Sequence, residues 1–393
     1  MVFMTYWFIL FSAIFIPIYY FISNAKLKRF YLLIISAIFH THFAGPAGVI
    51  PIIIVGIFSY YAGRSQKAKL IHAAILLNVL SLIFYKYACF FSIEIFKILG
   101  LREHLDQIKT LFPAAPPLAI SFFTFEFVHY LYDVKKGSKP INSLLDFSLF
   151  AIFWPSIVAG PVKRYQIFLE DLSQGIKSGW QDNFAPAILR ICSGYSKKII
   201  ADNLTLFISF NDESYFEKPL SMRWAHLLAV SMRIYMDFSG YSDLALGFAN
   251  LLGIKLPENF NWPYVANNLT DFWRRWHISL SSWIRDYVYI PLGGSRHGQH
   301  RKVFNGLLAF AICGLWHGAA WNFVLWGLFH GFGLAVSGNY RNWNNPLKKL
   351  GLLFDRYSFC SRAFTFLYVS IGWLIFFYPS NLCFKMIGSL FIP

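Results

Sequence analysis

The residues best suited to chemistry in this sequence are ionisable side chains that stand inside apolar stretches. His317 lies in FAICGLWHGAAWNFVLWGLFHGFG, with Gly314 before it and Gly318, Ala319 and Ala320 after it. Small residues on both sides allow a substrate or another backbone segment to come close to the imidazole. Because an imidazole exchanges a proton near neutral pH, His317 is a candidate acid–base group. The alternative is a buried histidine that is hydrogen-bonded to a neighbouring helix.

A second histidine, His330, follows 13 residues later. In a continuous helix it would lie about 20 Å further along and on nearly the opposite face, so we expect it not to share a site with His317. The sequences GLWHG at 314–318 and GLFHG at 327–331 resemble each other. Their spaced glycines predict two faces on which helices pack closely.

The segment NNLTDFWRRWHISLSSWIRDYVYIPLGG, at 267–294, mixes polar side chains with tryptophans. It is amphipathic and too polar to span a membrane, so we expect an interfacial or protein-buried helix pair. Asp271 and Arg275 are four residues apart, which favours a structural ion pair. His277 is the member able to exchange a proton near neutral pH. The alternative is a helix on the membrane surface whose arginines reach toward the headgroups.

A third group, Glu126, His129 and Asp133, shares one helical face. One helix cannot complete a metal shell and no matching carboxylate pair stands elsewhere, so we predict a buried hydrogen-bond network and no metal. Asp237 and Asp243 form a comparable polar pair.

The composition identifies the environment. Of the 393 residues, 56% are hydrophobic and 14% are charged, and the mean hydropathy is +0.48. Soluble domains carry about 25% charged residues, so a water-soluble enzyme, a disulfide scaffold and a disordered chain are excluded. The net charge of +16 fits loops held at anionic lipid, and no motif of nucleic-acid recognition is present. We therefore predict an all-α polytopic membrane protein with lipid, and not nucleic acid, as its surroundings.

Apolar runs long enough to span a membrane must position the candidate histidines and their polar neighbours. The first 22 residues are apolar without a basic leader or a cleavage site, so we expect a retained span. With the later runs we expect about 10 to 11 membrane segments, and 303–336 is long enough for two passes or one tilted helix. Basic residues follow the first, third and fifth runs, which predicts an N-terminus outside the cell. FWPSIVAGPV, at 153–162, is rich in proline and glycine and is expected to re-enter or stop short.

The sequence from YMDFSGYSDLALG through DFWRRWHISL to GLWHGAAWNFVLWGLFHG resembles the membrane-bound O-acyltransferase superfamily. It is most similar to the bacterial alginate O-acetyltransferase branch. The segment FWPSIVAGPVKRY of this chain also resembles a proline-rich stretch of that branch. Some likeness extends to the members that transfer D-alanine to teichoic acid. The resemblance implies a single membrane domain over 1–393, with N-terminal spans at 1–110, the family core at 115–335 and a C-terminal span at 336–393. It also implies short or re-entrant helices around a central funnel.

The resemblance places the family's invariant-type histidine at His317 and its second Asn/His position at His277. The motif around the second position covers Asp271, Arg274, Arg275 and Trp276. These four are candidates for binding the donor or substrate. Trp316, inside the WHG motif, and Asp237 are two further candidates.

We expect His317 to act as the general base that takes a proton from an acceptor hydroxyl, with an acyl-histidine step as the alternative. His277, or donors near it, is expected to orient the donor or stabilise the oxyanion. The acyl group, most simply acetyl, would come from a cytoplasmic thioester, either acetyl-CoA or an acyl carrier protein, and no tightly bound cofactor is expected.

The acceptor would be an extracytoplasmic polysaccharide, reached through an acetyl-transfer partner protein outside a bacterial plasma membrane. Two alternatives remain open. One is D-alanyl transfer to teichoic acid from a carrier protein. The other is a transporter of polysaccharide or lipid-linked substrate, for which inverted repeats would be expected.

Overall fold

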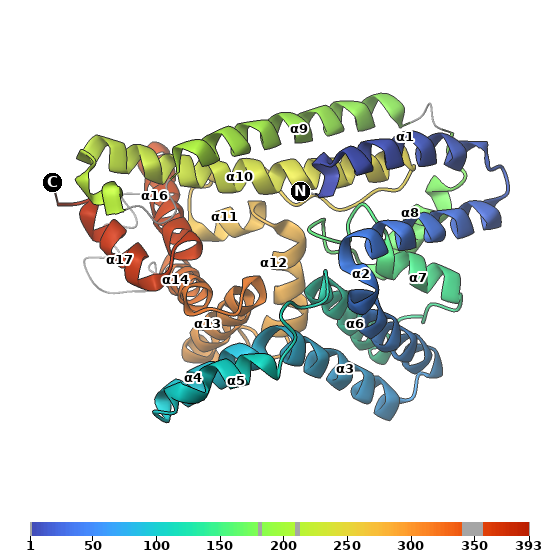
Figure 1. Ribbon diagram of the computed structural model, residues 1–393, viewed down its shortest axis with the longest axis horizontal. Coiled ribbons are helices and arrows are strands. Elements are labelled where there is room, and N and C mark those ends of the chain that lie inside the picture. The colour runs from blue at the N-terminus through green and yellow to red at the C-terminus, as the bar shows by residue number, and fades with distance from the viewer. Residues whose placement is uncertain (1, 180–182, 209–212, 340–356, 393) are drawn as a thin grey trace. The chain divides into compact units, whose positions relative to one another are not determined.

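The computed structural model describes residues 2–179, 183–208, 213–339 and 357–392, and this part of the chain forms helices, turns and no strand (Figure 1). The helices are α1 (Tyr6–Phe21), α2 (Ala25–Ser65), α3 (Ala68–Leu82), α4 (Ala88–Ile98), α5 (Leu105–Thr110), α6 (Ile120–Lys135), α7 (Leu144–Ile152), α8 (Tyr165–Gly175), α9 (Phe184–Phe207), α10 (Leu220–Leu251), α11 (Leu269–Arg275), α12 (Ile278–Ile284), α13 (Gly298–His317), α14 (Trp321–Ser337), α16 (Ser358–Phe377) and α17 (Ser380–Ser389). The all-α prediction is confirmed.

Three helical stretches in the described residues are long and apolar enough to cross a membrane alone. They are Ala47–Ser65 within α2, Ala68–Ile98 across α3 and α4, and Ser358–Phe377 in α16. A π-helical turn, Ile83–Tyr87, joins α3 to α4 without a break. The other predicted runs form helices that are shorter or carry more polar side chains, as α1 and α10 do. Length and hydropathy alone therefore identify fewer spans than the 10 to 11 that the sequence suggested.

Backbone breaks divide two of the apolar runs. Gly45 has φ of 67° inside α2, a left-handed conformation that glycine adopts without strain, and it separates the apolar stretches at 30–44 and 48–63. In 303–336 the chain leaves the helix after His317 and is extended at Gly318 and Ala320 before α14 begins. Of the two alternatives for this run, the structure has two helices.

The chain folds into two compact units. The first unit comprises Met1–Ser193 and Tyr241–Pro257, and the second comprises Gly194–Gly240 and Glu258–Pro393. The helices α9 and α10 each contribute one end to each unit. The division of one membrane domain into spans, core and C-terminal span stays a prediction.

In the first unit, α2 packs against α3, α6 and α7. The helix α7 ends at Ile152, and residues 153–164 follow without a helix. Trp154 in this stretch is fully buried, with its ring against those of Phe8 and Phe248. The prediction that the proline-rich run stops short is confirmed, because its backbone turns inside protein.

The polar group on α6 forms a buried network within this unit. Lys163 is 1% exposed, and its Nζ lies 2.6 Å from Glu126 Oε1 and 2.9 Å from Ser156 Oγ. The backbone N–H of Tyr165 donates to His129 Nε2 at 3.3 Å. The predicted buried hydrogen bonding is therefore confirmed for Glu126 and His129, with Lys163 as the cation that neutralises the carboxylate. Asp133 is only half-buried and accepts from Gln166 Nε2 at 2.9 Å.

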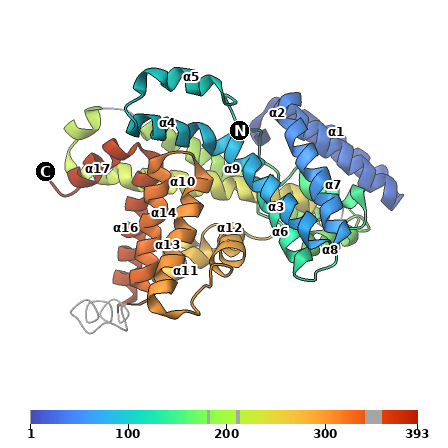
Figure 2. The same ribbon diagram turned by 90° about the horizontal axis from the view of Figure 1, so that it is seen from below.

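In the second unit, α13, α14 and α16 run side by side (Figure 2). Glycines allow α13 and α14 to touch. A Cβ built on Gly314 would lie 2.1 Å from the carbonyl oxygen of Phe323, and one on Gly327 would lie 2.1 Å from that of Phe310. The similar glycine-rich sequences are thus the two faces of one close helix contact, as predicted.

Candidate active site

His317 is the last residue of α13, at the point where the helix gives way to an extended segment. Its side chain is half-buried, and its ring lies 5.2 Å from that of Trp326 and 5.1 Å from that of Phe376. The close α13–α14 contact begins one helical turn earlier, at Gly314. The glycines therefore fix where the helix end, and the imidazole on it, can stand.

His277 joins α11 to α12 in a strained conformation. Its φ of 41° and ψ of 55° are left-handed, a region that a residue with a Cβ occupies at a cost of about 1–2 kcal/mol. Backbone bonds hold the segment in place: Ile278 N donates to Asn259 O at 2.9 Å, and Asn261 N donates to Arg275 O at 2.9 Å. Strain that the surrounding structure maintains in this way is typical of functional sites.

The His277 side chain is 1% exposed and is oriented by one polar neighbour. Its Nδ1 lies 3.3 Å from Asn259 Oδ1, and its Nε2 has no hydrogen-bond partner among the described residues. The ring of Phe238 packs against it at 4.6 Å. An oriented imidazole with one open nitrogen is a group that can exchange a hydrogen bond with a substrate.

The structure brings the two predicted histidines together around Trp316. The Trp316 ring lies 6.0 Å from the His277 ring and 4.8 Å from the His317 ring. Burial, with a smaller contribution from a charge on His317, lowers the pKa of His277 well below its usual range. His277 is therefore neutral at physiological pH.

Two candidates from the DFWRRW motif stabilise α11 itself. Arg275 Nε lies 2.8 Å from Asp271 Oδ1, which confirms the predicted ion pair. The backbone N–H of Asp271 donates to Asn268 Oδ1 at 2.9 Å, so the Asn268 side chain caps the helix. Arg275 also donates to the carbonyl of Asn261. Arg275 thus holds α11 against the 259–261 segment that positions His277, and Asp271 holds the guanidinium of Arg275 in place.

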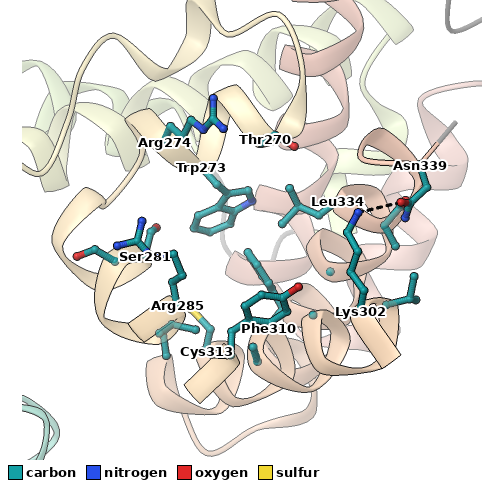
Figure 3. A pocket seen from close by; sticks show the side chains of 18 of the residues that line it. Thr270, Trp273, Arg274, Ser281, Arg285, Lys302, Phe310, Cys313, Leu334 and Asn339 are labelled. Atoms are coloured by element: carbon teal, nitrogen blue, oxygen red, sulfur yellow. Dashed lines mark hydrogen bonds between the residues drawn. The ribbon is translucent and has the colours of Figure 1, made fainter. Parts of the chain in front are cut away.

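Arg274 lines a different place, a pocket of about 580 Å³ in the second unit (Figure 3). Two other cationic residues that the sequence did not single out, Arg285 and Lys302, line the same pocket. Its apolar lining includes Trp273 and Phe310. Figure 3 shows the three cationic side chains around these aromatic rings, with Lys302 Nζ 3.0 Å from Asn339 Oδ1.

The lining of this pocket includes neighbours of both histidines. Ile278 follows His277 directly, and Cys313 lies one helical turn before His317. A pocket with cationic groups and an apolar interior can hold a ligand that joins a phosphate to an apolar or amide-containing arm.

The remaining candidates lie as follows. Trp276 is buried and packs on Trp373 with ring centroids 4.7 Å apart, which is a packing role. Asp237 forms an ion pair with Lys198, which also contacts Asp202. The structure therefore engages Asp237 away from His277, although its neighbour Phe238 contacts that ring.

The geometric reason for separating His330 from His317 is wrong, because it assumed one continuous helix. The Trp326 ring contacts both imidazoles, at 5.2 Å from His317 and 5.0 Å from His330. His330 is fully buried among aromatic rings, and neither of its ring nitrogens has a hydrogen-bond partner in the described part of the chain. These surroundings fit a packing role.

Sequence reasoning missed Asn259 as well as the two cations of the pocket. Asn259 precedes His277 by 18 residues, a separation that carries no local pattern. Arg285 and Lys302 had a weak signal, since Arg285 stands within the polar segment 267–294 and Lys302 directly precedes the apolar run 303–336.

Comparison with known proteins gives a consistent result. The family model of membrane-bound O-acyltransferases matches residues 58–380. The chain is 33% identical over 412 residues to the probable alginate O-acetylase AlgI of Pseudomonas putida, covering 97% of this chain and 78% of that protein. It is 33% identical over 332 residues to the peptidoglycan O-acetyltransferase of Helicobacter pylori, covering 78% and 61%. It is 30% identical over 273 residues to the teichoic acid D-alanyltransferase of Bacillus subtilis, covering 66% and 68%.

The match begins within the last part of α2 and runs from α3 through α16. It confirms the resemblance drawn from the DFWRRWHISL and WHG segments, and it favours an enzyme over a transporter. The chain belongs to the membrane-bound O-acyltransferase family and is a multi-pass membrane acyltransferase.

Proposed function

We propose that this enzyme transfers an acetyl group from a cytoplasmic thioester to a hydroxyl acceptor on the outer side of the membrane, in the O-acetylation of an extracytoplasmic polysaccharide. The observation that carries the proposal is the pairing of His317, at the broken end of α13, with the buried neutral His277 around Trp316. The names of the relatives support acetyl as the group, because two of the three reported are O-acetyl-transferring proteins.

His317 is the proposed general base. It takes the proton of the acceptor hydroxyl while the hydroxyl oxygen attacks the thioester carbonyl. The carbon–sulfur bond then breaks, and the leaving thiolate takes the proton from the imidazolium. Such proton transfer contributes about 10²–10⁴-fold to the rate. The half-buried position of the His317 ring supports this role, because the imidazole is reachable and yet partly shielded from water.

The pocket of Figure 3 is the proposed site of the donor. Arg274, Arg285 and Lys302 supply positive charge for the phosphates of coenzyme A or of a carrier's phosphate-bearing arm. The apolar lining around Trp273 and Phe310 suits the arm and the acyl chain. The donor is a co-substrate in this proposal, and no tightly bound cofactor or metal takes part.

The proposed setting is a bacterial plasma membrane with the N-terminus outside. A polar thioester cannot cross the hydrocarbon layer, since its polar groups would lose their hydrogen bonds there. A protein-lined route from a cytoplasmic donor to an outer acceptor removes that barrier. An extracytoplasmic acetyl-transfer protein is the proposed partner that passes the group to the polymer.

Polymer acylation in cells tests this function. Cells that produce the wild type, or His317→Ala at the same membrane level, are compared by mass spectrometry of esterified hydroxyls per sugar. We expect the wild type to add acetyl esters and the variant to lose them while it remains folded. Unchanged acylation in the variant would remove His317 from the mechanism.

D-alanyl transfer to teichoic acid is the second candidate. It is supported by the 30% identity to the Bacillus subtilis enzyme over 66% of this chain. The same mass spectra distinguish the two, because an alanyl ester differs from an acetyl ester in mass and carries an amine. Alanyl esters in place of acetyl esters would establish the second candidate.

A further inference from the structure

We infer that Asn259 is a positioning residue that holds His277 in the tautomer with the proton on Nδ1, so that Nε2 faces the site as a hydrogen-bond acceptor. The inference rests on the proposed function only in placing His277 at the reacting groups. It assigns a role to a residue that neither the motifs nor the family resemblance identified.

The orientation of the Asn259 amide follows from Ser279. The backbone N–H of Ser279 can only donate, and it lies 3.4 Å from Asn259 Oδ1. The Ser279 hydroxyl lies 2.6 Å from the same oxygen. The carbonyl oxygen of the amide, and not its NH₂ group, therefore occupies this position and faces His277.

The tautomer of His277 then follows. A carbonyl oxygen carries no proton, so the contact of 3.3 Å between Asn259 Oδ1 and His277 Nδ1 is a hydrogen bond only if Nδ1 donates. A neutral imidazole carries one N–H, and hence Nε2 carries a lone pair. That nitrogen has no hydrogen-bond partner among the described residues although it is buried. A buried acceptor left open in this way is available to a substrate N–H or O–H.

Asn259 also fixes the backbone of His277. Its carbonyl accepts from Ile278 N at 2.9 Å, which anchors the chain directly after the left-handed residue. One asparagine thus determines both the strained backbone and the ring proton of His277. Of the two expected roles, orienting the donor or stabilising the oxyanion, this tautomer favours the first for His277 itself, because its open nitrogen accepts a hydrogen bond.

The groups that face His277 come from four elements. They are Phe238 on α10, Asn259 before α11, Ser279 on α12, which donates to Asn259, and Trp316 with His317 on α13. His317 is the titratable group among them. The carboxylates nearby in sequence are turned elsewhere, since Asp237 pairs with Lys198 and Glu258 is exposed.

The pH profile of acyl transfer by the full chain in lipid vesicles tests the role of Asn259. In Asn259→Asp the carboxylate still accepts from Nδ1 and favours the imidazolium, so the acid limb of kcat should move up by about 1–3 pH units. Activity should recover toward the wild-type value at higher pH. Asn259→Ala should lose up to about 10²-fold at every pH, since the ring is no longer held. An unmoved acid limb in Asn259→Asp, or wild-type kcat in Asn259→Ala, overturns the inference.

Asn268→Asp is the matched control. Asn268 caps α11 through its side chain, and aspartate is an equally good cap, so the same substitution is introduced without a contact to His277. Its acid limb should coincide with that of the wild type. A shift as large as that of Asn259→Asp would show a general charge effect and overturn the inference.

The tautomer is also measurable in the wild type, without any variant of Asn259 and without transfer activity. Solid-state ¹⁵N NMR of histidine-labelled protein in lipid, with the spectrum of His277→Asn subtracted, isolates the two ring nitrogens of His277. Asparagine tolerates the left-handed backbone, so the subtracted variant keeps the segment. A proton on Nδ1 supports the inference and a proton on Nε2 overturns it. Absence of transfer by the wild type would instead refute the proposed function.

Discussion

The close contact between α13 and α14 makes a strong prediction for Gly327→Ala. The added methyl would lie 2.1 Å from the carbonyl oxygen of Phe310 and 2.9 Å from its carbonyl carbon. Ordinary contact begins at 3.4 Å, so the distance from the methyl to the carbonyl oxygen would be too short by more than about 1 Å. The obstacle is backbone and not a flexible side chain. The helices must therefore separate.

The separation has two consequences. Overpacking of this kind costs about 1–3 kcal/mol of stability. Because α13 carries His317 at its end, a displacement of about 1 Å is also expected to lower the transfer rate by about 10²-fold. The substituted residue lies on α14 and away from the proposed chemistry, so the loss would report the position of the helix end.

Thermal unfolding in detergent and transfer per folded molecule measure the two consequences. Gly388→Ala on α17 is the control, since nothing lies within 4 Å of its added methyl. The control should match or slightly exceed the wild type in stability, because alanine favours a helix by about 1 kcal/mol over glycine. If Gly327→Ala behaves as the control does in both assays, the packing argument is refuted.

Three further outcomes are expected. Arg274→Ala should raise the KM for the donor by about 10–100-fold, because one charged hydrogen bond is lost. Arg275→Ala should raise this KM less, and it should lower the free energy of unfolding by up to about 1 kcal/mol. Glu126→Gln should destabilise the protein by about 3–5 kcal/mol by leaving Lys163 buried without its partner, and adding Lys163→Met should recover most of the loss, both seen by thermal unfolding. Burial lowers the pKa of His277, so below about pH 6.5 the unfolded state binds a proton that the folded state does not. Relative to His277→Asn, the free energy of unfolding of the wild type should therefore fall by up to about 1.4 kcal/mol per pH unit in that range.

Each of these has a contradicting result. Equal KM values in the two arginine variants would mean that Arg274 does not meet the donor. A Glu126→Gln protein as stable as the wild type would mean that the buried pair is not needed. Unfolding curves of the wild type and His277→Asn that stay parallel from pH 7.5 to pH 5 would mean that His277 is not held neutral.

Local patterns predicted the parts of the site that lie within one turn of helix. The Asp271–Arg275 ion pair follows from a spacing of four residues, and the structure contains it. The break after His317 could not be predicted, because glycine and alanine fit either a helix or an extended segment. The sequence of 303–336 accordingly left one helix and two helices open.

Contacts between distant residues were beyond the reach of sequence patterns. Lys163 meets Glu126 from 37 residues away, and Lys198 meets Asp237 from 39 residues away. Asn259 reaches His277 because a short segment doubles back beside α11. Such pairs depend on how helices cross, which hydrophobic periodicity alone does not specify.

The most direct test of the central claim is acyl transfer by the purified enzyme in lipid vesicles. An acetyl thioester and a hydroxyl acceptor are supplied on opposite sides of the vesicle membrane, and release of the thiol is followed together with ester formation on the acceptor. His317→Ala is compared with His300→Ala, the same substitution at an exposed position on the same helix α13. The account predicts loss of both products by about 10²–10⁴-fold in His317→Ala and none in His300→Ala. Wild-type rates in a folded His317→Ala protein would contradict it.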